Sequence, residues 1–261
     1  MDIESITNKI INDDCMNVLK QLPDKCIDAI ICDLPYGTTA CSWDSIIPFD
    51  KLWEQYKRIR KDNTPIVLFG SEPFSSLLRC SNLKEYKYDW IWNKISGGNV
   101  LTTKYQPLKI HEIISVFCKE KCNYYPILEY GYKSRINEKP TIKSSDMFSG
   151  IKSNKFFHTA KSKPADARYP KSIITYSKQS SECCNSQSIH PTQKPVALIE
   201  YLIKTYSNEG DLILDNCSGS GSLAIAAYNT KRRFICIEKD YDYWKASVER
   251  LENVQAQLKL F

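Results

Sequence analysis

The sequence predicts an α/β fold with a doubly wound, mostly parallel sheet. Short apolar runs alternate with segments of helical period toward both ends of the 261-residue chain, which is the pattern of strands and crossover helices. Two of the apolar runs, residues 27–32 and 211–214, lead directly into polar turns. Ligands of doubly wound sheets bind at the carboxyl ends of the strands, so these two turns are candidate parts of one site.

The first part of the chain predicts strands and helices in alternation. Residues 49–61 carry apolar side chains at helical spacing. Ser71 and Pro73 are typical of the first turn of a helix, with Ser71 as its cap. The predicted strands of this part are residues 9–14, 27–32, 65–69, 86–92 and 112–118, and the predicted helices are residues 15–22, 49–61 and 71–78.

The last part of the chain returns to the same alternation. Between about residues 119 and 190 the periodicity fades, and no elements are assigned there. From Pro195 onward the sequence predicts helices at 196–207, 222–228 and 241–258 and strands at 211–214 and 233–237. We therefore expect residues 1–118 and 190–261 to be two halves of one domain and residues 119–189 to be an insertion.

The positive charge of the chain is concentrated in this insertion. Residues 119–193 contain 13 Lys or Arg against 6 Asp or Glu, whereas the net charge of the whole chain is +6. A positive excess confined to one segment favours a surface that meets phosphates, which predicts DNA as a partner. A solvated Lys-rich insertion is the alternative.

Neither a membrane nor a metal is predicted. The N-terminal residues lack a basic head and an apolar core, and nowhere do about 18 apolar residues run together, so we expect a cytoplasmic protein. Eleven cysteines without a signal peptide favour reduced thiols. Cys118, Cys122, Cys183, Cys184 and His190 are residue types that could form a zinc site, but their spacing matches no compact metal pattern.

The Gly-rich turn after residues 211–214 predicts a nucleoside cofactor. Gly219 and Gly221 allow the backbone to approach a ligand closely. Glu238 ends the next predicted strand, where its carboxylate can accept hydrogen bonds from two ribose hydroxyls. Asp215 repels the pyrophosphate of a dinucleotide and suits a cationic amino-acid tail. The turn thus favours S-adenosylmethionine over NAD, with a nicotinamide-dependent dehydrogenase and a Gly turn without ligand as alternatives.

Two further segments are candidates for the same cofactor. Asp14 follows the first strand and could accept a hydrogen bond from the cofactor's adenine amine, or could simply cap the helix that begins at Cys15. The run 190–195 precedes the helix that leads into the Gly-rich turn and could close the pocket, or could be a rigid loop between prolines. The predicted cofactor residues are Asp14, Cys15, Asp33, Thr192, Lys194, Pro195, Asp215, Asn216, Cys217, Ser218, Gly219, Gly221, Ser222 and Glu238.

The turn after residues 27–32 predicts a site for a flat amine-bearing ring. The Asp33 carboxylate and a main-chain carbonyl at Leu34 and Pro35 can each accept one hydrogen of an exocyclic amine, which favours a pyramidal nitrogen with an available lone pair. Pro35 fixes the backbone and offers no competing donor, and Tyr36 can stack on the ring. Asp33, Leu34, Pro35 and Tyr36 are therefore the predicted catalytic residues.

These motifs together resemble the DNA amino-methyltransferases of the beta arrangement, in which an Asp-Pro-Pro-Tyr motif comes first and the Gly-rich cofactor motif comes last. Asp33 to Tyr36 matches the first motif, with Leu34 where the family often has proline. Asp215 to Gly221 matches the second, and the resemblance covers residues 9–118 and 169–250. Residues 37–44 and 68–74 are similar to small adenine methyltransferases of phages and mobile elements.

The resemblance implies a circularly permuted, Rossmann-like methyltransferase sheet in which the strand ending at Asp14 lies beside the strand ending at Glu238. It implies a site-specific enzyme, of the kind found in restriction-modification, that methylates N6 of an adenine flipped out of double-stranded DNA, with residues 119–189 as the target-recognition region. An acidic first residue such as Asp33 is usual in adenine enzymes. Methylation of cytosine N4, a DNA-binding protein with a decayed site, and a homodimer all stay open.

Overall fold

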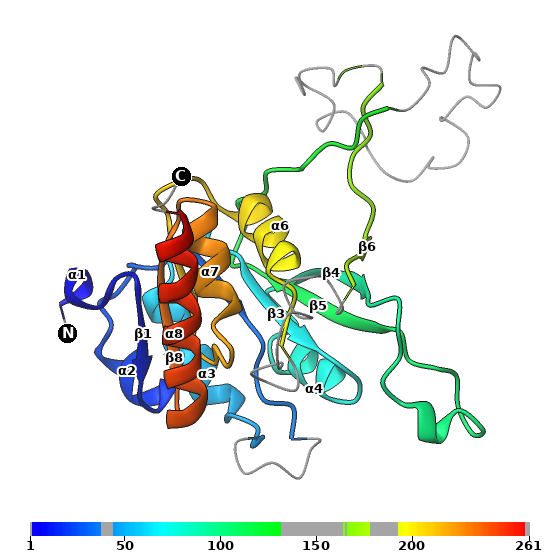
Figure 1. The fold of residues 1–261 in the computed structure, drawn as a ribbon, viewed down its shortest axis with the longest axis horizontal. Coiled ribbons are helices and arrows are strands. Elements are labelled where there is room, and N and C mark those ends of the chain that lie inside the picture. The colour runs from blue at the N-terminus through cyan, green and yellow to red at the C-terminus, as the bar shows by residue number, and fades with distance from the viewer. Residues whose placement is uncertain (1, 38–43, 132–163, 165, 178–192, 259–261) are drawn as a thin grey trace. The chain divides into compact units, whose positions relative to one another are not determined.

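A computed structural model describes residues 2–37, 44–131, 164, 166–177 and 193–258. The chain forms two compact units, one of residues 1–125 with 172–261 and one of residues 126–171. The first unit contains all the helices and strands named below (Figure 1). In the second unit, the backbones of Glu129 and Arg168 form an isolated antiparallel bridge. Much of the predicted insertion, 119–189, lies outside the described residues.

The first unit is built on an eight-stranded sheet with the order β1-β8-β7-β2-β3-β5-β4-β6. Strand β5 is antiparallel to both of its neighbours, and the other pairings among the described strands are parallel. The strands are β1 (Lys9–Asn12), β2 (Ala29–Cys32), β3 (Ile66–Gly70), β4 (Tyr86–Asn93), β5 (His111–Phe117), β6 (Ile173–Thr175), β7 (Leu212–Asp215) and β8 (Arg233–Glu238).

Helices cover both faces of this sheet (Figure 1). They are α1 (Ile3–Ile6), α2 (Cys15–Gln21), α3 (Phe49–Ile59), α4 (Phe74–Ser81), α6 (Val196–Tyr206), α7 (Ser222–Asn229) and α8 (Tyr241–Leu258), with one 3-10 turn, η1 (Val100–Thr102). None of the helices in the described part of the chain is long and apolar enough to cross a membrane. The predicted doubly wound, mostly parallel sheet is confirmed.

The core has two layers because neighbouring residues of a strand point to opposite faces. Ile31 of β2 packs in one apolar cluster with α6, α7 and α8, and Ile30 packs in the other with α2, α3 and α4. Burial on both faces explains why these strands are continuous apolar runs rather than alternating ones.

Two local expectations need correction. Ser71 does not cap the helix that follows β3, because α4 begins at Phe74 without a side-chain cap. The Ser71 hydroxyl instead accepts a hydrogen bond from the Lys109 ammonium, and the Glu72 carboxylate accepts one from the Ser76 amide at 3.1 Å. Strand β6 lies in a segment where no element was expected, since three residues give too short a pattern to recognise.

The strand order brings the two motifs to one edge of the sheet. β1 lies beside β8 as expected, with Asn12 opposite Glu238. β7 lies beside β2, so that the Gly-rich turn and the turn at Asp33 follow neighbouring parallel strands. Both turns are therefore at the carboxyl edge, where doubly wound sheets bind ligands.

Candidate active site

A cavity of about 720 Å³ opens at the carboxyl edge of the sheet and contains residues of both motifs. Its walls come from the turns after β1, β2, β7 and β8 and from the segment before α6. Of the predicted site residues, those that line the cavity are Asp14, Cys15, Asp33, Leu34, Pro35, Tyr36, Lys194, Asp215, Asn216, Cys217, Ser218, Gly219, Ser222 and Glu238.

Three predicted cofactor residues are placed differently. Thr192 lies outside the described residues. Pro195 is buried at the N-cap position of α6. Gly221 has a φ of +73°, and a Cβ atom there would lie 3.0 Å from the Cβ of Ser247 on α8. The backbone conformation and the close approach of α8 thus each favour glycine at position 221.

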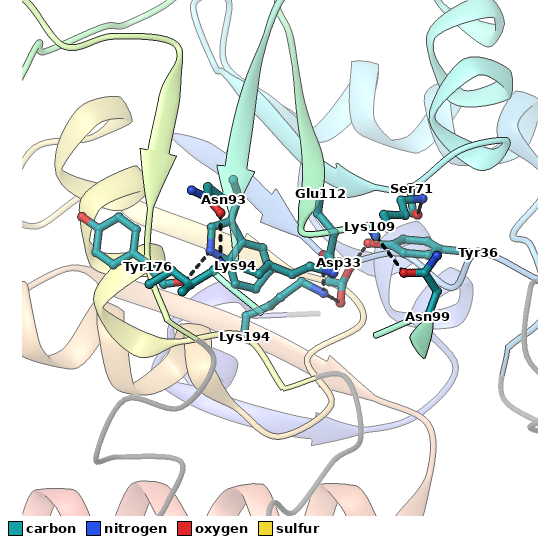
Figure 2. Close-up of polar contacts among 12 residues, drawn as sticks. Asp33, Tyr36, Ser71, Asn93, Lys94, Asn99, Lys109, Glu112, Tyr176 and Lys194 are labelled. Carbon is teal, nitrogen blue, oxygen red and sulfur yellow. Dashed lines mark hydrogen bonds and ion pairs between the residues drawn. The ribbon is translucent and has the colours of Figure 1, made fainter. Parts of the chain in front are cut away.

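Two side chains of the protein hold the carboxylate of Asp33 (Figure 2). Its Oδ1 accepts a hydrogen bond from the Tyr36 hydroxyl at 2.5 Å, and its Oδ2 accepts one from the Lys194 ammonium. The Tyr36 ring stacks on Phe74 with 4.9 Å between ring centroids. Burial, followed by the charge of Asp33, raises the pKa of Tyr36 well above its usual value. The hydroxyl therefore stays protonated and acts as the hydrogen-bond donor to Asp33.

The ammonium of Lys194 lies between two carboxylates. Its Nζ is 3.3 Å from Oε2 of Glu112 on β5, and Glu112 also pairs with Lys94 at 3.2 Å. Figure 2 shows Asp33, Glu112 and Lys194 pointing toward one another. Burial lowers the pKa of Lys194, but the charges of Asp33 and Glu112 raise it more, to about 12. The ammonium is therefore charged and fixed beside Asp33.

Sequence reasoning assigned Lys194 to the cofactor and missed Glu112 and Lys94. The structure shows that the Lys194 ammonium bonds to Asp33 and Glu112, although the side chain also lines the cavity. One signal was present, because Glu112 begins the predicted strand 112–118, whose other residues are apolar apart from Ser115. A buried charge in such a strand needs a partner of opposite charge.

The carboxylates of Glu238 and Asp215 line the cofactor half of the cavity. Glu238 accepts hydrogen bonds from the backbone amides of Gly219 at 2.7 Å and Asp240 at 2.8 Å, and burial raises its pKa. Asp215 is buried and accepts one from the amide of Cys217 at 3.1 Å. Burial raises the pKa of Asp215 to about 7, so the cavity disfavours its negative charge.

Other polar residues of the Gly-rich turn line the cavity and also connect the turn to neighbouring segments. The Ser218 hydroxyl is buried and makes no hydrogen bond with any residue that the structure describes. Asn216 accepts a hydrogen bond from the Tyr56 hydroxyl at 2.5 Å, which ties the turn to α3. The Ser222 hydroxyl donates to the main-chain oxygen of Lys194 at 2.9 Å and so connects the turn to the segment before α6.

Asp14 acts as the cap of α2, as the alternative interpretation of the sequence expected. Its Oδ1 accepts a hydrogen bond from the Met16 amide at 2.9 Å, and its Oδ2 lies 3.1 Å from the Lys239 ammonium. The next residue, Cys15, also lines the cavity, and a hydrogen bond with the Cys217 thiol lowers its pKa. Capping and cavity lining are therefore combined at Asp14.

The structure describes only Cys118 and Cys122 of the alternative zinc set. Cys183, Cys184 and His190 lie outside the described residues. Within the described ranges, no three His, Cys, Asp or Glu side chains are grouped as a metal site requires.

Comparison with known proteins places the chain in a family. The family model N6_N4_Mtase, described as a DNA methylase, matches residues 27–249. The type II methyltransferase M.HpaI of Haemophilus parainfluenzae is 27% identical over 259 residues, which cover 94% of this chain and 74% of that protein. The DNA adenine methyltransferase YhdJ of Escherichia coli K12 is 26% identical over 257 residues, covering 93% and 82% respectively.

Solved structures show the same fold. The M1.HpyAVI–SAM complex superposes with a TM-score of 0.58 at 22% identity and covers 93% of this chain and 98% of its own. The cytosine-N4-specific PvuII DNA methyltransferase gives a TM-score of 0.63 at 15% identity, with 95% and 90% covered. The family model spans most of the sequence, including both motifs that line the cavity, and the chain therefore belongs to this family of DNA methylases.

Proposed function

We propose that the protein is an S-adenosylmethionine-dependent methyltransferase that modifies the exocyclic N6 amine of an adenine flipped out of double-stranded DNA. One observation carries the proposal: Asp33 and the Gly-rich turn at Gly219 line the same cavity. A base held at the first motif and a methyl donor held at the second would then be neighbours.

The cavity suits S-adenosylmethionine on structural grounds. Its volume of about 720 Å³ is within the usual range for small-molecule sites. The buried hydroxyl of Ser218 needs a partner that the described residues do not supply. Asp215 is held in surroundings that disfavour its charge, and a cationic ligand would relieve that cost. We assign Asp215 to the cationic part of the cofactor and Glu238 to its ribose.

When bound, the cofactor supplies an electrophilic methyl group, and the protein positions the nucleophile. Tyr36 and Lys194 each give one hydrogen bond to a different oxygen of Asp33. A carboxylate oxygen accepts more than one such bond, so Asp33 retains capacity for an amine hydrogen. We assign the second hydrogen to the main-chain oxygen of Leu34, with Pro35 fixing the turn and Tyr36 stacking on the base.

Catalysis in this scheme consists mainly of orientation. A nucleobase amine is a weak nucleophile because its lone pair is delocalised into the ring, and two acceptors favour the pyramidal form with the lone pair directed outward. Holding that lone pair in line with the methyl group lowers the barrier without a covalent enzyme intermediate. Lys194 contributes by fixing Asp33, so we assign it as a positioning residue.

Adenine and duplex DNA are the finer parts of the proposal. An acidic residue at the position of Asp33 is usual in the adenine enzymes that the sequence resembles, while relatives and structural neighbours include both YhdJ and the cytosine-N4 PvuII enzyme. We assign residues 119–189 to DNA recognition because of their positive charge, with residues 1–118 and 190–261 as the two halves of the methyltransferase domain. A cytoplasmic location and a role in restriction-modification belong to the same proposal.

The direct test is transfer of labelled methyl groups from S-adenosylmethionine to unmethylated duplex DNA, followed by nucleoside analysis. We expect label in N6-methyladenine. Label in N4-methylcytosine instead would show that the target base is cytosine, the alternative to adenine. Cofactor and DNA binding without any transfer would contradict the enzyme assignment and favour a decayed site.

A further inference from the structure

The segment between β4 and β5, residues 95–110, exposes large apolar side chains beside positive charge. We call this segment the β4–β5 loop. Leu101 is 96% exposed and Tyr105 is 89% exposed. Val100, which directly precedes Leu101, is also exposed. The loop contains Lys104 and Lys109 and neither Asp nor Glu. It lies outside residues 119–189, so the charge distribution alone did not single it out.

The loop has a defined conformation. The Asn99 side chain accepts a hydrogen bond from the Lys109 amide at 2.7 Å and donates one to the Pro107 oxygen at 3.2 Å, which joins the two legs of the loop. Leu108 packs closely on Gly97, because a Cβ added to Gly97 would lie 2.4 Å from the Cγ of Leu108. The tip is thus held by its own contacts while its apolar side chains face solvent. A group of exposed apolar side chains on a fixed surface indicates a binding partner.

The loop begins and ends at the ligand edge of the sheet. β4 runs parallel to β3, because each is antiparallel to β5. Asn93, at the end of β4, is therefore at the same edge as Asp33. Only β3 separates β2 from β5, and strands are about 4.8 Å apart, so the two legs start roughly 10–15 Å from the end of β2. Figure 1 shows the β4–β5 loop extending away from the sheet.

Polar contacts connect the base of the loop to the candidate active site. The Lys109 ammonium donates to the Ser71 hydroxyl at the end of β3. Lys94, directly before the loop, pairs with Glu112, which pairs with Lys194 beside Asp33. Figure 2 draws the contacts of Lys109 with Ser71 and Asn99 in the same close-up as Tyr36 and Asp33. The loop is therefore fixed relative to the residues proposed to receive the base.

We infer that the β4–β5 loop contacts the DNA duplex at the position from which the base is extruded, with Leu101 and Tyr105 filling the space that the base leaves. This inference rests on the proposed function. The legs of the β4–β5 loop start roughly 10–15 Å from the end of β2, and the major groove of a duplex alone is about 12 Å wide. A duplex that delivers a base to the pocket must therefore also cover the loop. Apolar side chains inserted between base steps are a known way to stabilise opened DNA, and Lys104 suits a phosphate.

The test compares the wild type with a Leu101→Ser, Tyr105→Ser double variant on two DNA probes. The first probe is a duplex that carries the site methylated by the wild type. The second has the same target strand opposite an abasic position, so that the target base pair is already broken. Both residues are exposed, so the variant should fold. Leu83→Ser, at an exposed leucine after α4, is the matched control.

We expect the double variant to lose about tenfold or more in kcat/KM on the intact duplex and to regain most of that loss on the abasic probe, because opening costs little there. The control should match the wild type on both. Unchanged activity on the intact duplex would overturn the inference, and so would an equal loss on both probes. A change in sedimentation with normal DNA methylation would assign the loop to self-association instead. Absence of methylation by the wild type would refute the proposed function separately.

Discussion

Replacing Asp215 with Asn tests whether this buried carboxylate is held for a cationic ligand. Asn has nearly the same shape and can still accept the hydrogen bond from the Cys217 amide. The pKa of Asp215 rises from an ordinary value of 3.8 to about 7 in the folded chain. Each pKa unit is worth about 1.4 kcal/mol, so the negative charge costs the ligand-free protein about 4 kcal/mol at high pH.

The direction in which stability changes with pH depends on the pKa of Asp215 in the folded chain and in the unfolded chain. Below about pH 4 Asp215 is protonated in both the folded and unfolded chains, and the charge cost is absent. The cost grows as pH rises from about 4 to 7 and is complete above the folded pKa of about 7. The stability of Asp215→Asn relative to wild type should therefore increase by about 2.5 kcal/mol between pH 5 and pH 8.

The assay is denaturant unfolding of both proteins without cofactor at pH 5 and pH 8, together with S-adenosylmethionine titration at each pH. An unpaired amide donor in the variant costs about 1–3 kcal/mol, but this cost does not depend on pH. Wild-type cofactor affinity should rise with pH as Asp215 ionises, and the variant should show a flatter profile. A stability difference that stays constant, or falls, between pH 5 and pH 8 would refute the reasoning.

Three further changes separate the proposed roles. Glu238→Gln should weaken S-adenosylmethionine binding about tenfold in calorimetry with little change in kcat at saturating cofactor, since its loss affects the ribose contact. Lys194→Met leaves Asp33 and Glu112 without their shared cation, so it should lower both kcat and unfolding free energy, the latter by about 3 kcal/mol. Lys-to-Ala changes between residues 133 and 171 should weaken DNA binding and flatten its salt dependence, with unchanged cofactor affinity. Equal losses of cofactor affinity, kcat and DNA affinity in all three sets of variants would contradict this division.

Much of the site follows from local sequence signals combined with one topological rule. Asp33 and Gly219 each come at the end of a short apolar strand, and parallel strands deliver such residues to one edge, so their meeting was predictable. The capping role of Asp14 also follows from local sequence, because caps depend on the adjacent two or three residues.

The contacts that the sequence did not reveal join distant segments. Lys194 is 161 positions from Asp33, and a single sequence does not indicate which buried charges become partners at such separations. Glu112 carries a signal of its own as a carboxylate at the start of a predicted strand, but the sequence does not show that Lys94 and Lys194 are its partners. The conformation of the β4–β5 loop depends on Asn99 joining its two legs, a pairing that leaves no periodic signal.

The central claim is that Asp33 orients the target amine while other residues hold the cofactor. Its most direct test is Asp33→Ala, measured by single-turnover methyl transfer to DNA and by S-adenosylmethionine affinity in the same preparation. We predict that transfer falls about 10³-fold or more, as when a transition-state hydrogen-bonding group is removed, while the cofactor Kd changes only a few-fold. Methyl transfer at the wild-type rate by the Asp33→Ala protein would contradict the claim.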